Sequence, residues 1–466
     1  MHKQILLWFM FTAMAVPVHA QESGLQADFR GEGERLKKSC LGFDFKSLGS
    51  CAQVLFTDHP LHIAAGSIAP QNGFGAGAAF VAHWTPNETW RLNWNADAVA
   101  SPNGSWRAGV YMKAIRVPTR RIVVTTGTPG EPTDSNLAIS DIPFFNLYAQ
   151  ATSLNKIYYF GLGPSTTRGN RSVFGMNERI FGTNVVWPVF GKLNLSLYGE
   201  ANGRFVDIRG NHGESSPSIE ALYTETTAPG VTTQPGFAQF GEGIRLRPRL
   251  LSDYLRLNYF VNFQQFVAGD STFSFRRLSV DFSHQIPLYR KTTRTLLPRD
   301  NNGPDACAVD SSSDAKCPAV TRDLEGSVNL RFFLSDSFTS TGSVVPFYFQ
   351  PTLGGSDING NSSLPAFQDY RFRAPNVLFF HEAFEHSIWN LPIGVAVSAD
   401  QGKIALTRND FSSSPWLHTY SAGLTLRAGG FPQVYLLFSW GGGEGTHTSA
   451  SINASLLGGS VRPSLF

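Results

Sequence analysis

The feature that most constrains the fold is a two-residue alternation of apolar and polar side chains, repeated along the chain. In segment 89–100, Trp, Leu and Ala occupy the even positions, and Arg, Asn and Asp occupy most of the odd ones. Segments 105–114, 192–200 and 418–429 repeat the pattern. Successive side chains of a β-strand point to opposite faces, so this period predicts strands with one apolar and one polar face.

The length of these segments separates two kinds of β protein. They run for about ten residues, whereas strands of soluble proteins usually have about 5–6. About ten tilted residues cross the hydrocarbon core of a bilayer. Alternation also suits a soluble sandwich, but strand length, Trp and Tyr near segment ends and long polar loops favour a membrane barrel. The sequence predicts an all-β fold: a transmembrane antiparallel β-barrel of about 16 strands over residues 71–466.

The N-terminal residues predict export from the cytoplasm. Residues 1–20 have a basic start, an apolar stretch and a Val18-x-Ala20 ending, which is typical of a signal peptide. No other uninterrupted apolar run is long enough for a spanning helix. Residues 21–70 alternate less, and we expect them to form an N-terminal periplasmic or plug segment.

Four cysteines fit an oxidising compartment. Cys40 and Cys51 bracket one short segment, and Cys307 and Cys317 bracket another. Three pairings are possible in principle, and closeness in sequence favours the disulfides 40–51 and 307–317. The spacings lack the tight clusters of a zinc site.

Composition and motifs exclude several functions. Charged residues make up 16% of the chain, the net charge is +3, and no Lys/Arg run predicts a nucleic-acid partner. His381 and His386 are five residues apart, which places them on opposite faces of a strand rather than together on a helix. The chain also lacks the G-x-S-x-G motif of serine hydrolases. We expect no enzyme activity, no cofactor and no metal.

Four long polar segments are expected to be loops on the external side of the barrel. They span 118–142, 209–234, 289–321 and 354–375.

The last of these loops carries a resemblance to a known family. Gly354 and Gly355 form a GG pair, residues 369–373 read DYRFR, and Asp400-Gln401-Gly402 follows in a later strand. An earlier segment, 158–166, reads YYFGLGPST. These motifs resemble the outer-membrane barrel of the bacterial surface antigen superfamily, the group of BamA, TamA and the two-partner-secretion transporters.

The resemblance implies a loop that folds back into the barrel lumen. Its candidate residues are Phe367, Asp369, Arg371, Phe372 and Arg373. The family's Leu-Arg-Gly-Phe tip is here Leu-Pro-Ala-Phe, residues 364–367, so the usual arginine is missing.

A partner for this loop is expected on the strand that carries the Asp-x-Gly motif. Alternation places Asp400 on the polar face, where Arg371 or Arg373 is expected to pair with it; Gly402 lies on the same strand. A solvated external loop is the alternative.

The family implies a location in the bacterial outer membrane and a role in membrane biogenesis or in translocation of protein or lipid. The expected partners are outer-membrane lipid, client proteins and a separate periplasmic module, because residues 21–70 are too short for one periplasmic domain of the family. A passive porin-like channel and a structural surface protein are the alternatives.

Overall fold

The computed structural model describes residues 30, 34, 61–87, 89–116, 142–211, 213–298, 316–389, 391–428 and 431–452. The predicted signal peptide lies outside these residues, as do Cys40, Cys51 and Cys307. The side chain of Cys317 is not described either, so both disulfides stay predictions.

The chain divides into two units, Met1–His62 and Ile63–Phe466. The elements described below belong to the second unit, apart from the first two residues of its first strand. That strand, β1, spans Leu61–Ser67 and pairs with β2, Phe74–Asn87. The sheet therefore begins before residue 71, the predicted start of the barrel.

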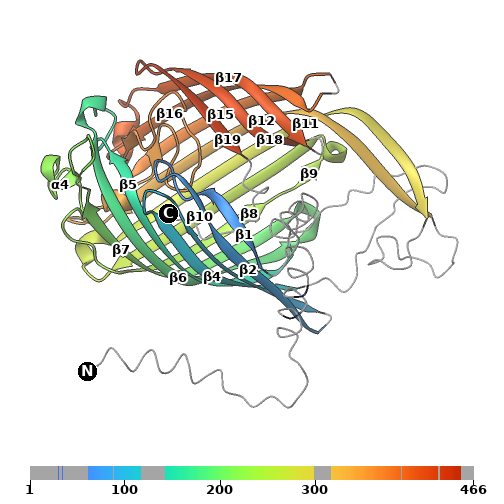
Figure 1. Cartoon of the computed structure of the whole chain (residues 1–466), viewed down its shortest axis with the longest axis horizontal. Helices are drawn as coiled ribbons and strands as arrows, with labels where there is room; N and C mark the ends of the chain where they lie inside the picture. Colours follow the sequence, from blue (N-terminus) through green and yellow to red (C-terminus); the bar gives the residue numbers. More distant parts are fainter. Residues whose placement is uncertain are drawn as a thin grey trace, which may run out of the picture. The chain divides into compact units, whose positions relative to one another are not determined.

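Nearly all the regular structure is one antiparallel sheet of 17 strands, which Figure 1 shows side by side. After β1 and β2, its strands are β3 Trp90–Ala100, β4 Trp106–Arg116, β5 Phe144–Tyr159, β6 Ser172–Phe190, β7 Leu195–Gly210, β8 Phe237–Leu246, β9 Arg249–Leu250, β10 Leu255–Ala268, β11 Phe275–Pro298, β12 Lys316–Thr339, β15 Asn376–Ser387, β16 Ile393–Ala405, β17 Leu417–Ala428, β18 Phe431–Gly441 and β19 Thr446–Ile452. A separate two-stranded sheet joins β13, Thr352–Leu353, to β14, Phe372–Arg373. The α-helix α4, Ile219–Leu222, has four residues, and no described helix is long and apolar enough to cross a membrane.

The strands pair in chain order. Antiparallel registers run from β2 to β8, pass from β8 to β10, and continue through β11, β12 and β15 to β19. The two-residue β9 pairs with the start of β10. The all-β prediction is confirmed, and the strand number is close to the expected one. Among the described residues, no register pairs β19 with β1 or β2, so closure of the sheet into a barrel stays a prediction.

The two faces of the sheet are the reverse of those in a soluble sandwich. In β7, Ser196, Asn202 and Arg204 are buried, whereas Leu197 and Phe205 are about half exposed. The same contrast recurs around the sheet. Buried polar residues include Asp97, Arg107, Gln150, Glu178, Gln239, Gln264, Thr419, Ser421 and Ser439. Exposed apolar residues include Trp94, Val110, Leu147, Phe181, Phe240, Ile244, Val397, Leu424, Leu436 and Phe438. A water-soluble sheet buries its apolar side instead.

The connections do not all leave the sheet at one end. We call the end that carries the β5–β6, β7–β8, β12–β15 and β18–β19 connections the capped end. An odd number of antiparallel strands separates these from the β4–β5 and β11–β12 pairs, so the ends of those strands that face their connections lie at the opposite end of the sheet. Residues 117–141 and 299–315 themselves lie outside the described part of the chain. The prediction that all four long loops share one side is wrong. Loop length did not reveal the side, because strand parity decides it.

The predicted loop 289–321 is also shorter than expected. β11 continues to Pro298 and β12 begins at Lys316, so much of this segment is a paired two-stranded ribbon. Its threonine and basic residues lack the clean alternation of the other strands.

Candidate functional site

The loop between β12 and β15, residues 340–375, is mostly buried and is here called the inner loop. Phe347, Phe349 and Leu364 have no exposed surface, and Phe367 and Tyr370 are almost fully covered. The alternative of a solvated external loop is therefore wrong for the main part of this segment.

Aromatic packing joins the inner loop to the sheet. The ring of Phe347 lies 5.1 Å from that of Tyr159 in β5 and 5.2 Å from that of Phe174 in β6. The ring of Phe349 lies 4.8 Å from that of Phe237 at the start of β8. Rings at these separations add to the stability gained from their burial alone. The loop is thus held by several strands near the capped end.

The GG pair has a steric reason. Gly354 and Gly355 have φ of +97° and +61°, which side chains rarely adopt. A Cβ on Gly355 would also lie 2.5 Å from the backbone nitrogen of Asp369. The Asp369 carboxylate accepts hydrogen bonds from the backbone N–H of Ser356 at 2.8 Å and from Nε2 of Gln71 at 2.6 Å. The GG turn and the start of DYRFR therefore form one unit.

Arg371 is the most heavily engaged charged residue of the loop. Its guanidinium donates to both carboxylate oxygens of Glu444, through Nε at 2.8 and 2.9 Å and Nη2 at 2.6 Å. It also donates to the hydroxyl and carbonyl oxygens of Thr166 at 2.8 and 2.7 Å. The Phe372 ring lies 4.4 Å from the guanidinium carbon. Bidentate pairing of this kind fixes the arginine in direction as well as in charge.

Arg373 is bound by backbone carbonyls rather than by a carboxylate. Its Nη1 donates to the carbonyl oxygens of Phe347 at 2.7 Å and Gln350 at 3.4 Å. Burial without a nearby carboxylate lowers the pKa of Arg373 to about 10. This arginine links the two halves of the inner loop.

The two sequence motifs that carry the family resemblance touch each other. The backbone N–H of Gly163, in YYFGLGPST, donates to the carbonyl oxygen of Arg373 at 2.8 Å. Phe160 of the same segment lies 5.1 Å from the guanidinium of Arg371, and Thr166 accepts its hydrogen bonds. Residues more than 200 positions apart thus form one site.

Asp400 has a different partner from the predicted one. It is buried in β16, as alternation predicted, but its Oδ1 lies 2.8 Å from Nδ1 of His381 in β15. The expected pair with Arg371 or Arg373 is therefore corrected. The strand register explains the change, because His381 lies directly opposite Asp400.

Gly402 and Phe367 lie at two close approaches between the inner loop and the sheet. A Cβ on Gly402 would lie 2.7 Å from Cδ1 of Leu353, so the missing side chain gives the inner loop room beside β16. Phe367 packs against Phe372 and covers Gly442 in the β18–β19 turn, where a Cβ would lie 2.1 Å from its ring. Among the predicted site residues, Asp400 is the one whose side chain pairs with another strand, through His381, instead of with the inner loop.

Sequence reasoning missed the partners Thr166, Gly442 and Glu444. Thr166 ends the quoted YYFGLGPST segment, which was a usable signal. Gly442 and Glu444 belong to GGGEG, 441–445, which reads as an ordinary turn. No feature of the sequence near this turn indicates that Glu444 pairs with an arginine of the inner loop.

A second polar group lines the buried face of the sheet. Glu178 in β6 and Arg204 in β7 form an ion pair at 2.8 Å with both side chains almost fully covered. Arg204 also donates to Gln239, and Glu200 accepts from Gln239 at 3.1 Å and Gln264 at 2.7 Å. Burial of these charged groups is tolerated because each of them has hydrogen-bonding partners.

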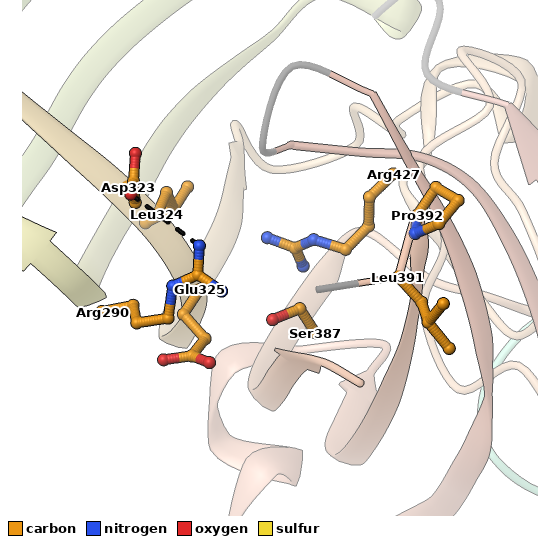
Figure 2. A pocket seen from close by; sticks show the side chains of 8 residues that line it. All are labelled: Arg290, Asp323, Leu324, Glu325, Ser387, Leu391, Pro392 and Arg427. Atoms are coloured by element: carbon orange, nitrogen blue, oxygen red, sulfur yellow. Dashed lines mark ion pairs between the residues drawn. The ribbon is translucent and has the colours of Figure 1, made fainter. Parts of the chain in front are cut away.

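The opposite end of the sheet contains a cavity of about 290 Å³. Figure 2 shows the side chains around it, which come from β11, β12, β17, the end of β15 and the β15–β16 turn. In the described part of the chain, no group of three or more His, Cys, Asp or Glu residues is arranged to hold a metal.

No protein-family model and no curated protein matches the sequence. Among solved structures, the chain is similar to CdiB from Acinetobacter baumannii, with 11% identity and a TM-score of 0.43 over 82% of this chain and 55% of that one. It is also similar to CdiB from Escherichia coli, with 13% identity and a TM-score of 0.45 over 82% of this chain and 59% of that one. BamA from Haemophilus ducreyi lacking POTRA domains 1–3 is similar with 9% identity and a TM-score of 0.44, over 89% of this chain and 80% of that one. The chain spans little more than half the length of the two CdiB structures.

Proposed function

We propose that this chain is a bacterial outer-membrane β-barrel of the surface antigen type that acts in membrane biogenesis or in translocation of protein or lipid. Its role is non-enzymatic and needs no cofactor. Lipid surrounds the sheet, and client proteins or a separate periplasmic module are its partners.

The observation that carries the membrane location is the reversed sheet. Leu197 and Phe205 are exposed while Arg204, between them in sequence, is buried with its partners. An apolar exposed face is stable in hydrocarbon and unfavourable in water. A closed barrel also satisfies every strand edge, which lipid requires.

The packing of the inner loop favours a gated function rather than a permanently open pore. It fills space beside the polar face with aromatic side chains and binds the sheet through charged hydrogen bonds. A segment packed in this way obstructs the polar interior of a barrel. The Arg371–Glu444 pair adds a contact that a client or partner would have to displace if the loop moves.

The test is the conductance of the purified protein in planar bilayers, with and without residues 354–375. We expect low conductance in the intact protein and large steady conductance after the deletion. Large conductance in the intact protein would favour the passive channel. Deletion of the exposed Gly342, in the same loop, is the matched control and should leave conductance low.

Two further measurements separate the remaining possibilities. If the deletion variant fails to fold, Glu444→Gln serves in its place, because it weakens the attachment of the loop to the sheet without removing the loop. Depletion of the protein in cells should lower the amount of other barrel proteins or of a transported lipid or protein in the outer membrane. No change in any of these would favour the structural surface protein.

A further inference from the structure

The far parts of β11 and β12 form a ribbon that the rest of the sheet does not cover. The register of β11 with β10 ends at Gln285, and that of β12 with β15 ends at Gly326. Beyond these points, the registers of the described residues pair the two strands only with each other, up to Pro298 and Lys316. Figure 1 shows this ribbon extending past the neighbouring strands at the end of the sheet opposite the capped end. We call it the β11–β12 ribbon.

The two edges of the ribbon differ at its base. On the β11 side, the Tyr289 hydroxyl donates to Oδ2 of Asp253 at 2.9 Å and accepts from Nη2 of Arg256 at 2.9 Å. The ring of Tyr254 packs against Tyr289 at 5.4 Å. The turn between β8 and β10 therefore buttresses this edge.

The β12 side instead borders the cavity of about 290 Å³. Asp323, Leu324 and Glu325 form one wall, and Ser387 with Leu391 and Pro392 of the β15–β16 turn form the other. Figure 2 shows Arg427 reaching toward the space between these walls and Arg290 beside Asp323. The cavity lies where β15 stops pairing with β12, in line with the next strand position.

An open strand edge of this kind presents unpaired N–H and C=O groups that pair readily with another strand. A two-stranded ribbon is also only marginally stable by itself in water. We propose that the edge of β12 beside the cavity binds an extended segment of a partner polypeptide as an added β-strand. This surface is separate from the inner loop and does not depend on what crosses the membrane.

The chemistry of the cavity suits a peptide. Its walls carry guanidinium groups from Arg290 and Arg427 and carboxylates from Asp323 and Glu325. Donors and acceptors around one cavity match the carbonyl and N–H groups of a peptide better than a simple anion. Strand addition takes its affinity from main-chain hydrogen bonds, and side-chain pockets add specificity.

The test uses the purified full chain in detergent micelles and two fluorescein-labelled peptides. One is an eight-residue peptide of alternating Thr and Val, and the other is the same peptide N-methylated at every internal residue. Fluorescence anisotropy should show saturable binding of the first. The second should bind about tenfold more weakly or not at all, because it cannot donate main-chain hydrogen bonds.

Two variants locate the binding. Replacing residues 292–322 by Asn-Gly joins Lys291 to Asp323, which are register partners, and removes most of the ribbon. Ser387→Trp fills the cavity and leaves β11 and β12 intact. The shortened ribbon keeps only Asp323 to Glu325 of the open edge and should weaken binding about tenfold or more, because most main-chain partners are lost. Ser387→Trp should abolish binding, and both variants should keep the heat-unfolding midpoint of the sheet.

Several results would overturn the proposal. They are no saturable binding of the first peptide, equal binding of both peptides, and binding that survives both variants. A concentration-dependent dimer of the intact chain that the shortened ribbon abolishes would assign the edge to a second copy instead of a partner.

Discussion

Arg371 and Glu444 lie 73 residues apart in sequence and form a bidentate ion pair that joins the inner loop to the β18–β19 turn. The arginine side chain is 2% exposed and the glutamate 19%. The turn connects the last two described strands, so the pair ties the loop to the hairpin at one edge of the described sheet. A contact at this place can couple the position of the loop to that of the edge strands.

Glu444→Gln should loosen the inner loop. The change leaves a buried guanidinium without its counter-charge, and we expect a loss of about 2–3 kcal/mol, below the ~3–5 kcal/mol of a fully buried pair. Trypsin should cut faster at Arg371 or Arg373, and the midpoint of the heat-induced gel shift should fall.

Glu214→Gln is the matched control for this change. Glu214 pairs with Lys156 at 2.8 Å, but both side chains are roughly one-third exposed. Exposed pairs contribute about 0–1 kcal/mol, so trypsin cleavage should stay at the original rate. Equal effects of the two substitutions would contradict a special role for the Arg371 pair.

Asp400→Asn should leave the inner loop closed. Its contact is with His381 on the neighbouring strand, and an amide can keep one hydrogen bond to that ring. We expect a cost of about 1 kcal/mol in unfolding free energy and no change in tryptic cleavage of the loop. Faster cleavage would restore the predicted pair between Asp400 and a loop arginine.

Local pattern was enough to predict much of this molecule. Alternation gave the strands and put Asp400 on the buried polar face, and DYRFR with the GG pair identified the inner loop. The partner of Arg371 could not be predicted, since it comes from a glycine-rich turn whose own residues satisfy ordinary turn rules. Strand register decided the partner of Asp400, and register is a property of pairs of strands rather than of one segment.

The prediction that the long loops share one side of the sheet is wrong for a related reason. Long loops were assigned to one side by length, but each added strand reverses the side of the next connection. β11 and β12 have 24 residues each and extend far into the segment 289–321 that was predicted to be a loop. The outer ends of β11 and β12 alternate only weakly between apolar and polar residues, so the sequence does not indicate strands there.

Gly442→Ala should disturb the loop more than Gly443→Ala. The two glycines have similar φ, +70° and +78°, so the backbone strain of an added Cβ is alike. At Gly442 that Cβ would also lie 2.1 Å from Cζ of Phe367, whereas nothing lies within 4 Å at Gly443. Overpacking should add about 1–3 kcal/mol to the cost at Gly442, measured by heat or denaturant unfolding. Phe367→Leu should recover part of the difference, and equal costs at both glycines would show that Phe367 does not press on this turn.

Leu197→Arg tests which solvent the exposed face meets. Leu197 lies within β7 and is 49% exposed, close to the 50% of Leu222 in α4, outside the sheet. In a bilayer, arginine on the lipid face costs about 2–4 kcal/mol near the midplane and falls toward zero at the interfaces. Leu197 is the third residue of β7, so Leu197→Arg should lower the unfolding free energy in liposomes by about 1–2 kcal/mol, and Leu222→Arg should change it by less than about 0.5 kcal/mol. Water around β7 would make both substitutions nearly neutral, since replacing an exposed leucine by arginine on a solvated strand changes stability little.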